Sequence, residues 1–158
     1  LQQMFGRACE FVAFEADLLD HREYSGWLAL WAPDGRYVVP VDPDSADFED
    51  TLNYAYDDAA MRDMRVRRLS SGESMSAANA ARTLRNVSRF RLMGAEGGNL
   101  RLRCAQQLVE YKFETHRIYA ANVDWTLADD GNGSFRIVRK IVRLINGGDA
   151  LAGMSFLP

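Results

Sequence analysis

The stretch EADLLDHREYSGWLALWAPDGRYVVP, from Glu15 to Pro40, constrains the fold of this chain more than any other part. It completes a run of apolar side chains at helical spacing, which predicts a helix over residues 3–21. Glu15 is the one polar residue on the apolar face of that helix. Tyr24 and Ser25 interrupt the spacing, so we expect a long amphipathic helix to stop there and a new element to begin.

A second, shorter element rich in aromatic residues follows this break. We expect Ser25 to be the N-cap of a short helix that places Trp27 and Trp31, four residues apart, on one face. Pro33-Asp34-Gly35 is a turn sequence, which predicts the end of this helix. Residues 36–39 then form a strand.

Residues 42–50, DPDSADFED, carry five carboxylates in nine positions. Such a density suggests a cation site, but the segment lacks the central glycine and the closing glutamate of a calcium-binding loop. We therefore expect a solvated acidic surface loop, followed by a strand over residues 52–56.

A basic helix is predicted next, starting at Asp57 or Asp58 and running to about Leu69. Its arginines are Arg62, Arg65, Arg67 and Arg68. Acidic residues at the start and arginines near the end suit the helix dipole, but the same arginines would also suit docking on an acidic partner surface. Both explanations stay open from the residues alone. Residues 70–81, which are small and polar, indicate an irregular connector.

From residue 83 onward the sequence predicts long strands joined by tight turns at residues 95–99 and 129–133. The predicted strands cover 83–94, 100–115, 116–127 and 135–145. In the second strand the apolar register slips by one residue, which predicts a β-bulge near residues 105–108. Helices first and a strand meander after them indicate an α+β fold, with helices on one face of a curved sheet.

Length and composition predict one domain over residues 1–158, with no linker or internal repeat. The net charge of -3 and the pI near 5.4 argue against a nucleic-acid binder. No apolar run approaches the ~18 residues of a membrane span, and no signal segment opens the chain. Cys9 and Cys104 are isolated, so we expect reduced thiols and a cytoplasmic protein.

The inventory of chemical groups predicts no catalytic, cofactor or metal site in this chain. His21 and His116 are its only histidines, and neither cysteine has a Cys-x-His or Cys-x-x-His neighbour. A Rieske cluster takes two Cys and two His, and a mononuclear iron site takes two more His and a carboxylate. No P-loop, GxSxG, GxGxxG or HExxH motif occurs either.

Four segments together resemble the small (β) subunit of bacterial aromatic-ring-hydroxylating dioxygenases, in the nuclear transport factor 2-like (cystatin-like) superfamily. Each segment is mostly core pattern and turn, and their order and spacing carry the resemblance. They are residues 15–40, the basic helix from Asp57-Asp58 to Leu69, Arg82-Thr83-Leu84-Arg85-Asn86-Val87, and the ending from Phe135 through Leu144-Ile145-Asn146 to Leu151.

The resemblance implies a cone-shaped sheet, antiparallel or mixed, wrapped around N-terminal helices. It also implies a structural, non-catalytic role beside an α subunit that holds a Rieske 2Fe-2S cluster and mononuclear Fe(II). Three copies of each chain would form a hexamer, supplied with electrons by a ferredoxin or reductase. The ending is nearer to the enzymes of benzoate type. By position, the residues expected at the partner interface are Arg65, Arg68, Met154, Phe156 and Leu157.

The same superfamily leaves an alternative open, because ketosteroid isomerases, scytalone dehydratases and polyketide cyclases use the cone as an active site. A free-standing enzyme of this type would line its pocket with Tyr24, Trp27, Tyr37, His116 and Asp124. Burial in such a cavity would raise the pKa of a carboxyl group and make it a useful base. A third hypothesis, a general protein-binding module on the same cone, also stays open.

Overall fold

The computed structural model describes residues 2–73, 81–147 and 156–158, and within them a six-stranded sheet and three helices. The helices are α1 (Gln2–Asp20), α2 (Tyr24–Leu28) and α3 (Ala59–Glu73). The strands are β1 (Trp31–Pro40), β2 (Asn53–Asp57), β3 (Arg82–Glu96), β4 (Asn99–Lys112), β5 (Thr115–Asp129) and β6 (Phe135–Leu144). None of the helices in these ranges combines the length and apolar character needed to cross a membrane.

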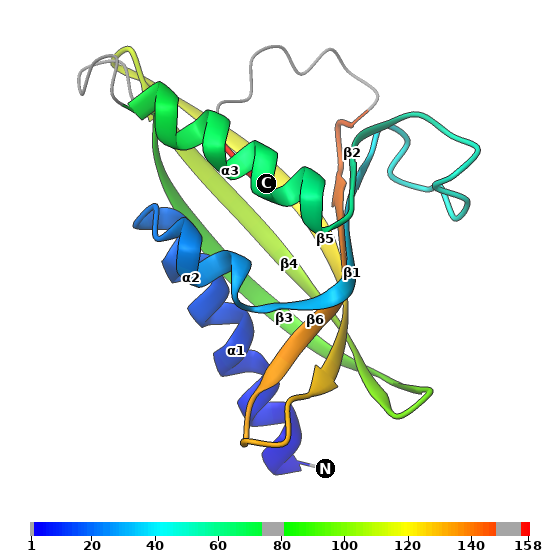
Figure 1. The fold of residues 1–158 in the computed structure, drawn as a ribbon. Coiled ribbons are helices and arrows are strands. Elements are labelled where there is room, and N and C mark those ends of the chain that lie inside the picture. The colour runs from blue at the N-terminus through cyan, green and yellow to red at the C-terminus, as the bar shows by residue number, and fades with distance from the viewer. Residues whose placement is uncertain (1, 74–80, 148–155) are drawn as a thin grey trace.

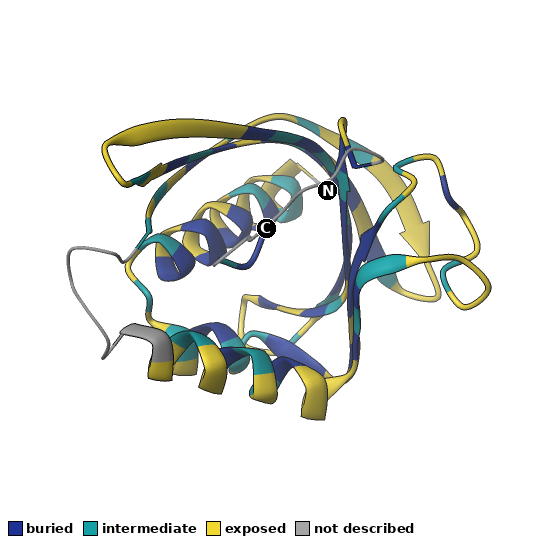
Figure 2. Ribbon diagram, turned by 90° about the horizontal axis from the view of Figure 1, so that it is seen from above, coloured by how far each residue is buried: buried dark blue, intermediate teal, exposed yellow. Residues whose placement is uncertain are grey.

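The strands lie in the order β2-β1-β6-β5-β4-β3, and every neighbouring pair is antiparallel except β1 and β6, which are parallel. The sheet curves around α1, while α3 lies across the opposite side of the opening (Figures 1 and 2). This arrangement confirms the predicted α+β fold with a curved mixed sheet around N-terminal helices.

The core lies between α1 and the concave, inner face of the sheet (Figure 2). The helix contributes Phe11, Val12 and Leu19, each at most 4% exposed, as its apolar spacing predicts. Alternate residues of β4 and β5 face them. Burying a side chain of this size stabilises the fold by about 1.5–3 kcal/mol, so the α1–sheet contact is a main source of stability.

The aromatic segment after α1 differs from the prediction. Glu23, not Ser25, is the N-cap of α2, and Trp31 and Pro33-Asp34-Gly35 belong to β1 rather than to a helix and its turn. The reason is pairing with the sheet, because the Ile137 amide donates to the Leu30 carbonyl at 2.8 Å. The turn residues form an irregularity in the β1–β6 register between Trp31 and Arg36. A strand partner distant in sequence has overridden the local turn signal.

The predicted bulge in β4 is also wrong. Register with β5 is unbroken from Leu100 to Lys112, and every second residue faces inward. The inward positions simply change from apolar residues to Gln106 and Glu110, both buried, so the apolar alternation was a misleading guide to the backbone. The irregularities of the β3–β4 pair lie instead in β3, where Arg89 has φ 52°.

The remaining boundaries follow the sequence closely. Gly97 and Gly98 have positive φ in the β3–β4 turn, as a two-residue hairpin requires. Asp58 caps α3, because its Oδ1 accepts a hydrogen bond from the Met61 amide at 3.0 Å. Helix α3 continues to Glu73, four residues further than predicted, and the rest of the predicted connector up to residue 80 lies outside the described residues.

Candidate functional site

The interior of the cone contains a buried ion pair. Lys140 of β6 donates from Nζ to Glu15 Oε2 of α1 at 2.6 Å, and the two side chains are 0% and 1% exposed. The same carboxylate oxygen accepts a bond from Trp27 Nε1 at 3.0 Å. Burial lowers the pKa of Lys140, while Glu15 acts in the opposite direction. The polar exception on the apolar face of α1 is therefore the carboxylate that meets this amine.

Aromatic rings lie around the ion pair. Trp27, Trp31 and Tyr37 meet edge to face, with ring centroids 5.4–5.9 Å apart. Lys140 Nζ lies 5.1 Å from the centroid of the Trp125 ring. Burial raises the pKa of the Tyr37 hydroxyl far above its usual value, so this phenol stays protonated. The centre of the cone is thus a packed core with one ion pair.

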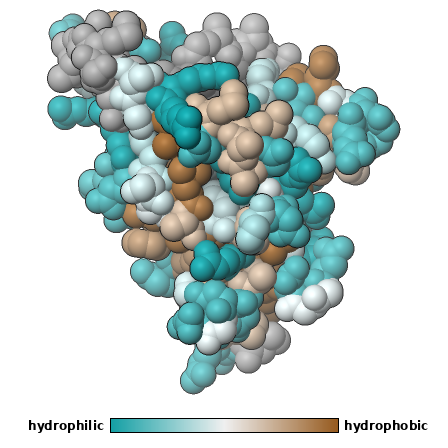
Figure 3. Space-filling view, in the orientation of Figure 1, coloured by the Kyte–Doolittle hydropathy of each residue, from teal (hydrophilic) through white to brown (hydrophobic). Residues whose placement is uncertain are grey.

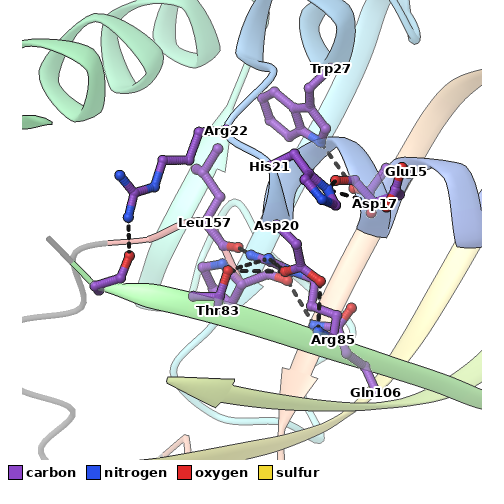
Figure 4. Close-up of polar contacts among 12 residues, drawn as sticks. Glu15, Asp17, Asp20, His21, Arg22, Trp27, Thr83, Arg85, Gln106 and Leu157 are labelled. Atoms are coloured by element: carbon purple, nitrogen blue, oxygen red, sulfur yellow. Dashed lines mark hydrogen bonds and ion pairs between the residues drawn. The ribbon is translucent and has the colours of Figure 1, made fainter. Parts of the chain in front are cut away.

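Residues 156–158 lie at the mouth of the cone (Figure 2), where Leu157 lies beside Arg85 (Figure 4). Arg85 of β3 donates from Nη1 to Asp20 Oδ1 at 2.5 Å and from Nη2 to the Leu157 carbonyl. Gln106 Nε2 donates to the Pro158 carbonyl at 2.9 Å. Leu157 is only 5% exposed. Apolar side chains show between α3 and the α1–α2 pair, framed by hydrophilic helix surfaces (Figure 3). Side chains of β3 and β4 thus hold the C-terminal residues in place.

The five residues proposed for a cone pocket do not come together. Trp27 and Tyr37 are buried in the aromatic core, and Tyr24 packs against it. His116 is exposed and lies against Tyr111, with ring centroids 4.9 Å apart. Asp124 binds Arg143 Nε at 2.8 Å on the outer face, because β5 turns Val123 and Trp125 inward on either side of it.

A groove of about 610 Å³ lies on the outer, convex face of the sheet, and we call it the arginine groove. Its lining residues are Pro43, Asp44, Arg89, Arg91, Arg103, Asn122, Asp124, Arg143 and Ile145. The register explains the clustering, since Arg91, Arg103 and Asp124 are direct neighbours across β3, β4 and β5. From the sequence, Asp124 was singled out as a pocket residue and Asp44 as part of the acidic loop, but none of the arginines of this groove was.

The match to a family model decides the family. The model, described as ring hydroxylating beta subunit, matches residues 14–147. The chain belongs to the ring-hydroxylating β subunits.

Individual relatives agree with this family. The chain is 31% identical over 128 residues, 80% of its own length and 71% of the relative's, to the small oxygenase component of the p-cumate 2,3-dioxygenase system of Pseudomonas putida. A benzene 1,2-dioxygenase subunit beta of P. putida is 36% identical over 95 residues, which are 55% of this chain and 51% of that protein.

A solved structure supports the fold. The β subunit of benzoate 1,2-dioxygenase from Burkholderia mallei superposes with a TM-score of 0.77 at 23% identity and covers 94% of each chain. At this identity the likeness shows the fold alone. The six-stranded curved sheet, which α1 and α2 precede in the chain, is therefore the architecture of a ring-hydroxylating β subunit.

In this β subunit the arginines of α3 mostly hold its own fold together. Arg62 is 2% exposed, donates to the Gly35 carbonyl at 2.6 Å and lies 4.2 Å from the centroid of the Trp31 ring. Arg65 binds both carboxylate oxygens of Asp57. These two side chains tie α3 to β1 and β2, a role that neither the dipole nor the docking hypothesis predicted.

The other interface candidates differ in exposure. Arg68 is exposed on α3, whereas Phe156 is half-buried, with its ring centroid 5.0 Å from that of Tyr119. Leu157 is buried in the mouth of the cone, and Met154 lies outside the described residues. Of this set, Arg68 is the described residue whose side chain a partner could reach directly.

Sequence reasoning missed three features of this β subunit, and two of them had a detectable signal. Glu15 on an apolar helix face and Lys140 among strand apolar residues each break a pattern, which indicates a buried pair. Arg85 in a strand entering the core is a similar signal. The arginine groove has none, because its members come from strands far apart in sequence. Across the described ranges, no three His, Cys, Asp or Glu side chains gather as metal ligands.

Proposed function

We propose that this chain is the structural β subunit of an aromatic-ring-hydroxylating dioxygenase, in which three copies brace three catalytic α subunits. The observation that carries the proposal is the match to the ring hydroxylating beta subunit model over residues 14–147, and the packed centre of the cone supports a structural role. Aromatic rings and the Glu15–Lys140 pair occupy its centre, and residues 156–158 occupy its mouth. These described elements share one core, which supports a single domain over residues 1–158.

The proposal assigns the metal chemistry to the partner. The α subunit would hold the Rieske 2Fe-2S cluster and the mononuclear Fe(II), and a ferredoxin or reductase would supply electrons in the cytoplasm. The substrate class would be an aromatic ring, with a carboxylated ring favoured by the p-cumate and benzoate enzymes among the similar proteins. The β subunit would contribute stability and geometry rather than reacting groups.

An apolar patch on the outer face of the sheet offers a surface for such bracing. Leu84, Ile118 and Phe113 are 57%, 66% and 66% exposed, and Tyr111 is 41% exposed. Leu84 and Ile118 both lie opposite Val109, one on each side of β4. Contiguous exposed apolar side chains of this size mark interaction sites, and obligate interfaces are rich in them. Together with Arg68, this patch is the proposed contact with the α subunit.

The isomerase, dehydratase or cyclase alternative needs an open cone lined by its five candidate residues. The separation of His116 and Asp124 from Trp27 and Tyr37 by the full thickness of the sheet counts against it.

Co-expression with an α subunit encoded beside this chain tests the proposed function. Native mass spectrometry should find equal numbers of both chains, and iron should track the α subunit. Ile118→Arg should remove the α subunit from the complex, whereas Phe14→Arg, a matched change at a half-exposed residue of α1, should not. Stoichiometric iron on this chain alone, or a homo-oligomer that ignores the α subunit and turns over cyclic ketones, would contradict the proposal.

A further inference from the structure

The arginine groove carries more positive charge than its own acids neutralise. Asp124 is occupied by Arg143 at 2.8 Å, and the Asn122 amide oxygen accepts from Arg89 at 2.5 Å. Arg103 donates only to the Met93 sulfur, at 3.3 Å. Among the described residues, neither Arg91 nor Arg103 has a carboxylate partner. The groove therefore presents two guanidinium groups, side by side on paired strands, to whatever lies against it.

The acidic loop, residues 42–50, shows the opposite imbalance. It holds five carboxylates, and the ion pairs found in the described part of the chain include none of them. Glu49 and Asp50 are exposed, and Leu52 just beyond them is 80% exposed. The acidic loop and the exposed Leu52 beside it therefore form a surface suited to contact with another protein chain.

The base of the acidic loop already lies in the groove of its own copy, where Asp44 is part of the lining. Arg143 donates to the Pro43 and Ser45 carbonyls at 2.9 and 2.6 Å, which fixes the base of the loop at the edge of the groove. From this base the segment between β1 and β2 projects away from the sheet (Figure 1). Asp42, Asp47, Glu49 and Asp50 are not part of the groove lining, so these four carboxylates remain for a contact with another copy.

The surfaces match in charge and also in apolar character. The groove ends at Ile145, which is 67% exposed, and the loop ends at Leu52. A neighbouring copy would therefore bring carboxylates to Arg91 and Arg103 and an aliphatic side chain to Ile145. Guanidinium groups suit this role because they bind carboxylates through two parallel bonds.

We propose that the acidic loop of one β subunit docks into the arginine groove of the next β subunit. The contact joins two different surfaces, so its repetition forms a closed ring when the rotation between neighbours divides a full turn, and an open filament when it does not. The proposal rests on the proposed function only for the number of copies, which is three. It assigns the contact between like chains to this loop and groove, and leaves the apolar patch for the α subunit.

Charge reversal tests the contact on the purified full chain, by sedimentation velocity and native mass spectrometry at low salt. Arg91→Glu/Arg103→Glu and, separately, Glu49→Lys/Asp50→Lys should each raise the dissociation constant of self-association about 10- to 100-fold. The chain with all four changes should associate again, because its loop and groove remain complementary with exchanged signs. Added salt should weaken the wild-type assembly.

Arg67→Glu/Arg136→Glu is the matched control, since it makes the same charge change at two exposed arginines elsewhere. It should leave self-association unchanged, and circular dichroism should confirm that all variants are folded. A monomeric wild-type chain at low salt, an unaffected groove variant, or a folded fourfold variant that does not associate would overturn the proposal.

Capture of the α subunit, measured in parallel, distinguishes failure of the loop–groove contact from failure of the proposed function. If it persists while the ring contact fails, the proposed function stands, and if the groove variant loses only the α subunit, the groove belongs to that partner.

Discussion

The buried Glu15–Lys140 pair gives the sharpest test of how the cone is stabilised. Lys140→Met removes the cation and leaves the Glu15 carboxylate in a site where both side chains are at most 1% exposed. One hydrogen-bond donor, Trp27 Nε1 at 3.0 Å, remains to it. Removing one member of a buried pair costs about 3–5 kcal/mol. Glu15→Gln should cost a similar amount, because it leaves the ammonium group without its anion.

The cost is large for a domain whose total stability is of the order of 5–15 kcal/mol. At about 2–4 °C per kcal/mol for a chain of this size, each single variant should lower Tm by roughly 6–20 °C. Urea unfolding followed by tryptophan fluorescence measures the free energy of unfolding directly. The double variant Glu15→Gln/Lys140→Met should be more stable than the sum of the single changes predicts, by about 2 kcal/mol or more.

Arg67→Met is the control for this experiment, because Arg67 forms an exposed i,i+4 pair with Asp63 at 2.9 Å. Pairs of that kind contribute about 0–1 kcal/mol. If the two single variants of the buried pair cost no more than this control, or if their effects simply add, the ion pair is not what holds α1 against β6.

Three further predictions concern single positions. Gly35→Ala should destabilise the chain by about 1–3 kcal/mol, because the added Cβ would lie 2.7 Å from a backbone oxygen. Gly6→Ala should instead stabilise α1 by about 0.5–1 kcal/mol, because no atom lies within 4 Å of the added Cβ. Thermal unfolding of the two variants compares these effects. Burial raises the pKa of Cys104 to about 11, so native alkylation at pH 8 should modify the partly exposed Cys9 and spare Cys104 until urea is added. Arg85→Leu should free the Leu157 carbonyl, and hydrogen exchange of the Leu157 amide should rise while that of α1 stays low.

The parts of this fold that could be predicted from the sequence are those determined by residues close together in the chain. Helical spacing located α1 to within a residue at each end, and paired glycines located the β3–β4 hairpin. Local chemistry failed where a distant strand decided the outcome. Pro33-Asp34-Gly35 reads as a turn until β6 pairs beside it.

The candidate site followed the same division. A single polar residue in an apolar stripe, Glu15, was visible in the sequence, but its partner lies 125 residues away and only the folded sheet identifies it. Tyr24, Trp27 and Tyr37, named as pocket-lining residues, lie in or against the packed core, whereas His116 and Asp124 lie on the outer face. The apolar alternation of β5, with Val123 and Trp125 inward, already indicates that Asp124 faces outward. The arginine groove depends on register across several strands, which no local pattern encodes.

The parallel pairing of β1 with β6 has a consequence for how the chain is made. Strand β1 ends at Pro40, and its parallel partner β6 begins at Phe135. During synthesis, the edge of β1 that pairs with β6 therefore stays unpaired until almost all the other strands have been made. Contacts between such distant segments slow folding, and during that interval Trp27, Trp31 and Tyr37 are available to other chains. The β subunit is therefore expected to need protection by chaperones while it is synthesised, and to mature fastest when translation runs through β6 without pausing.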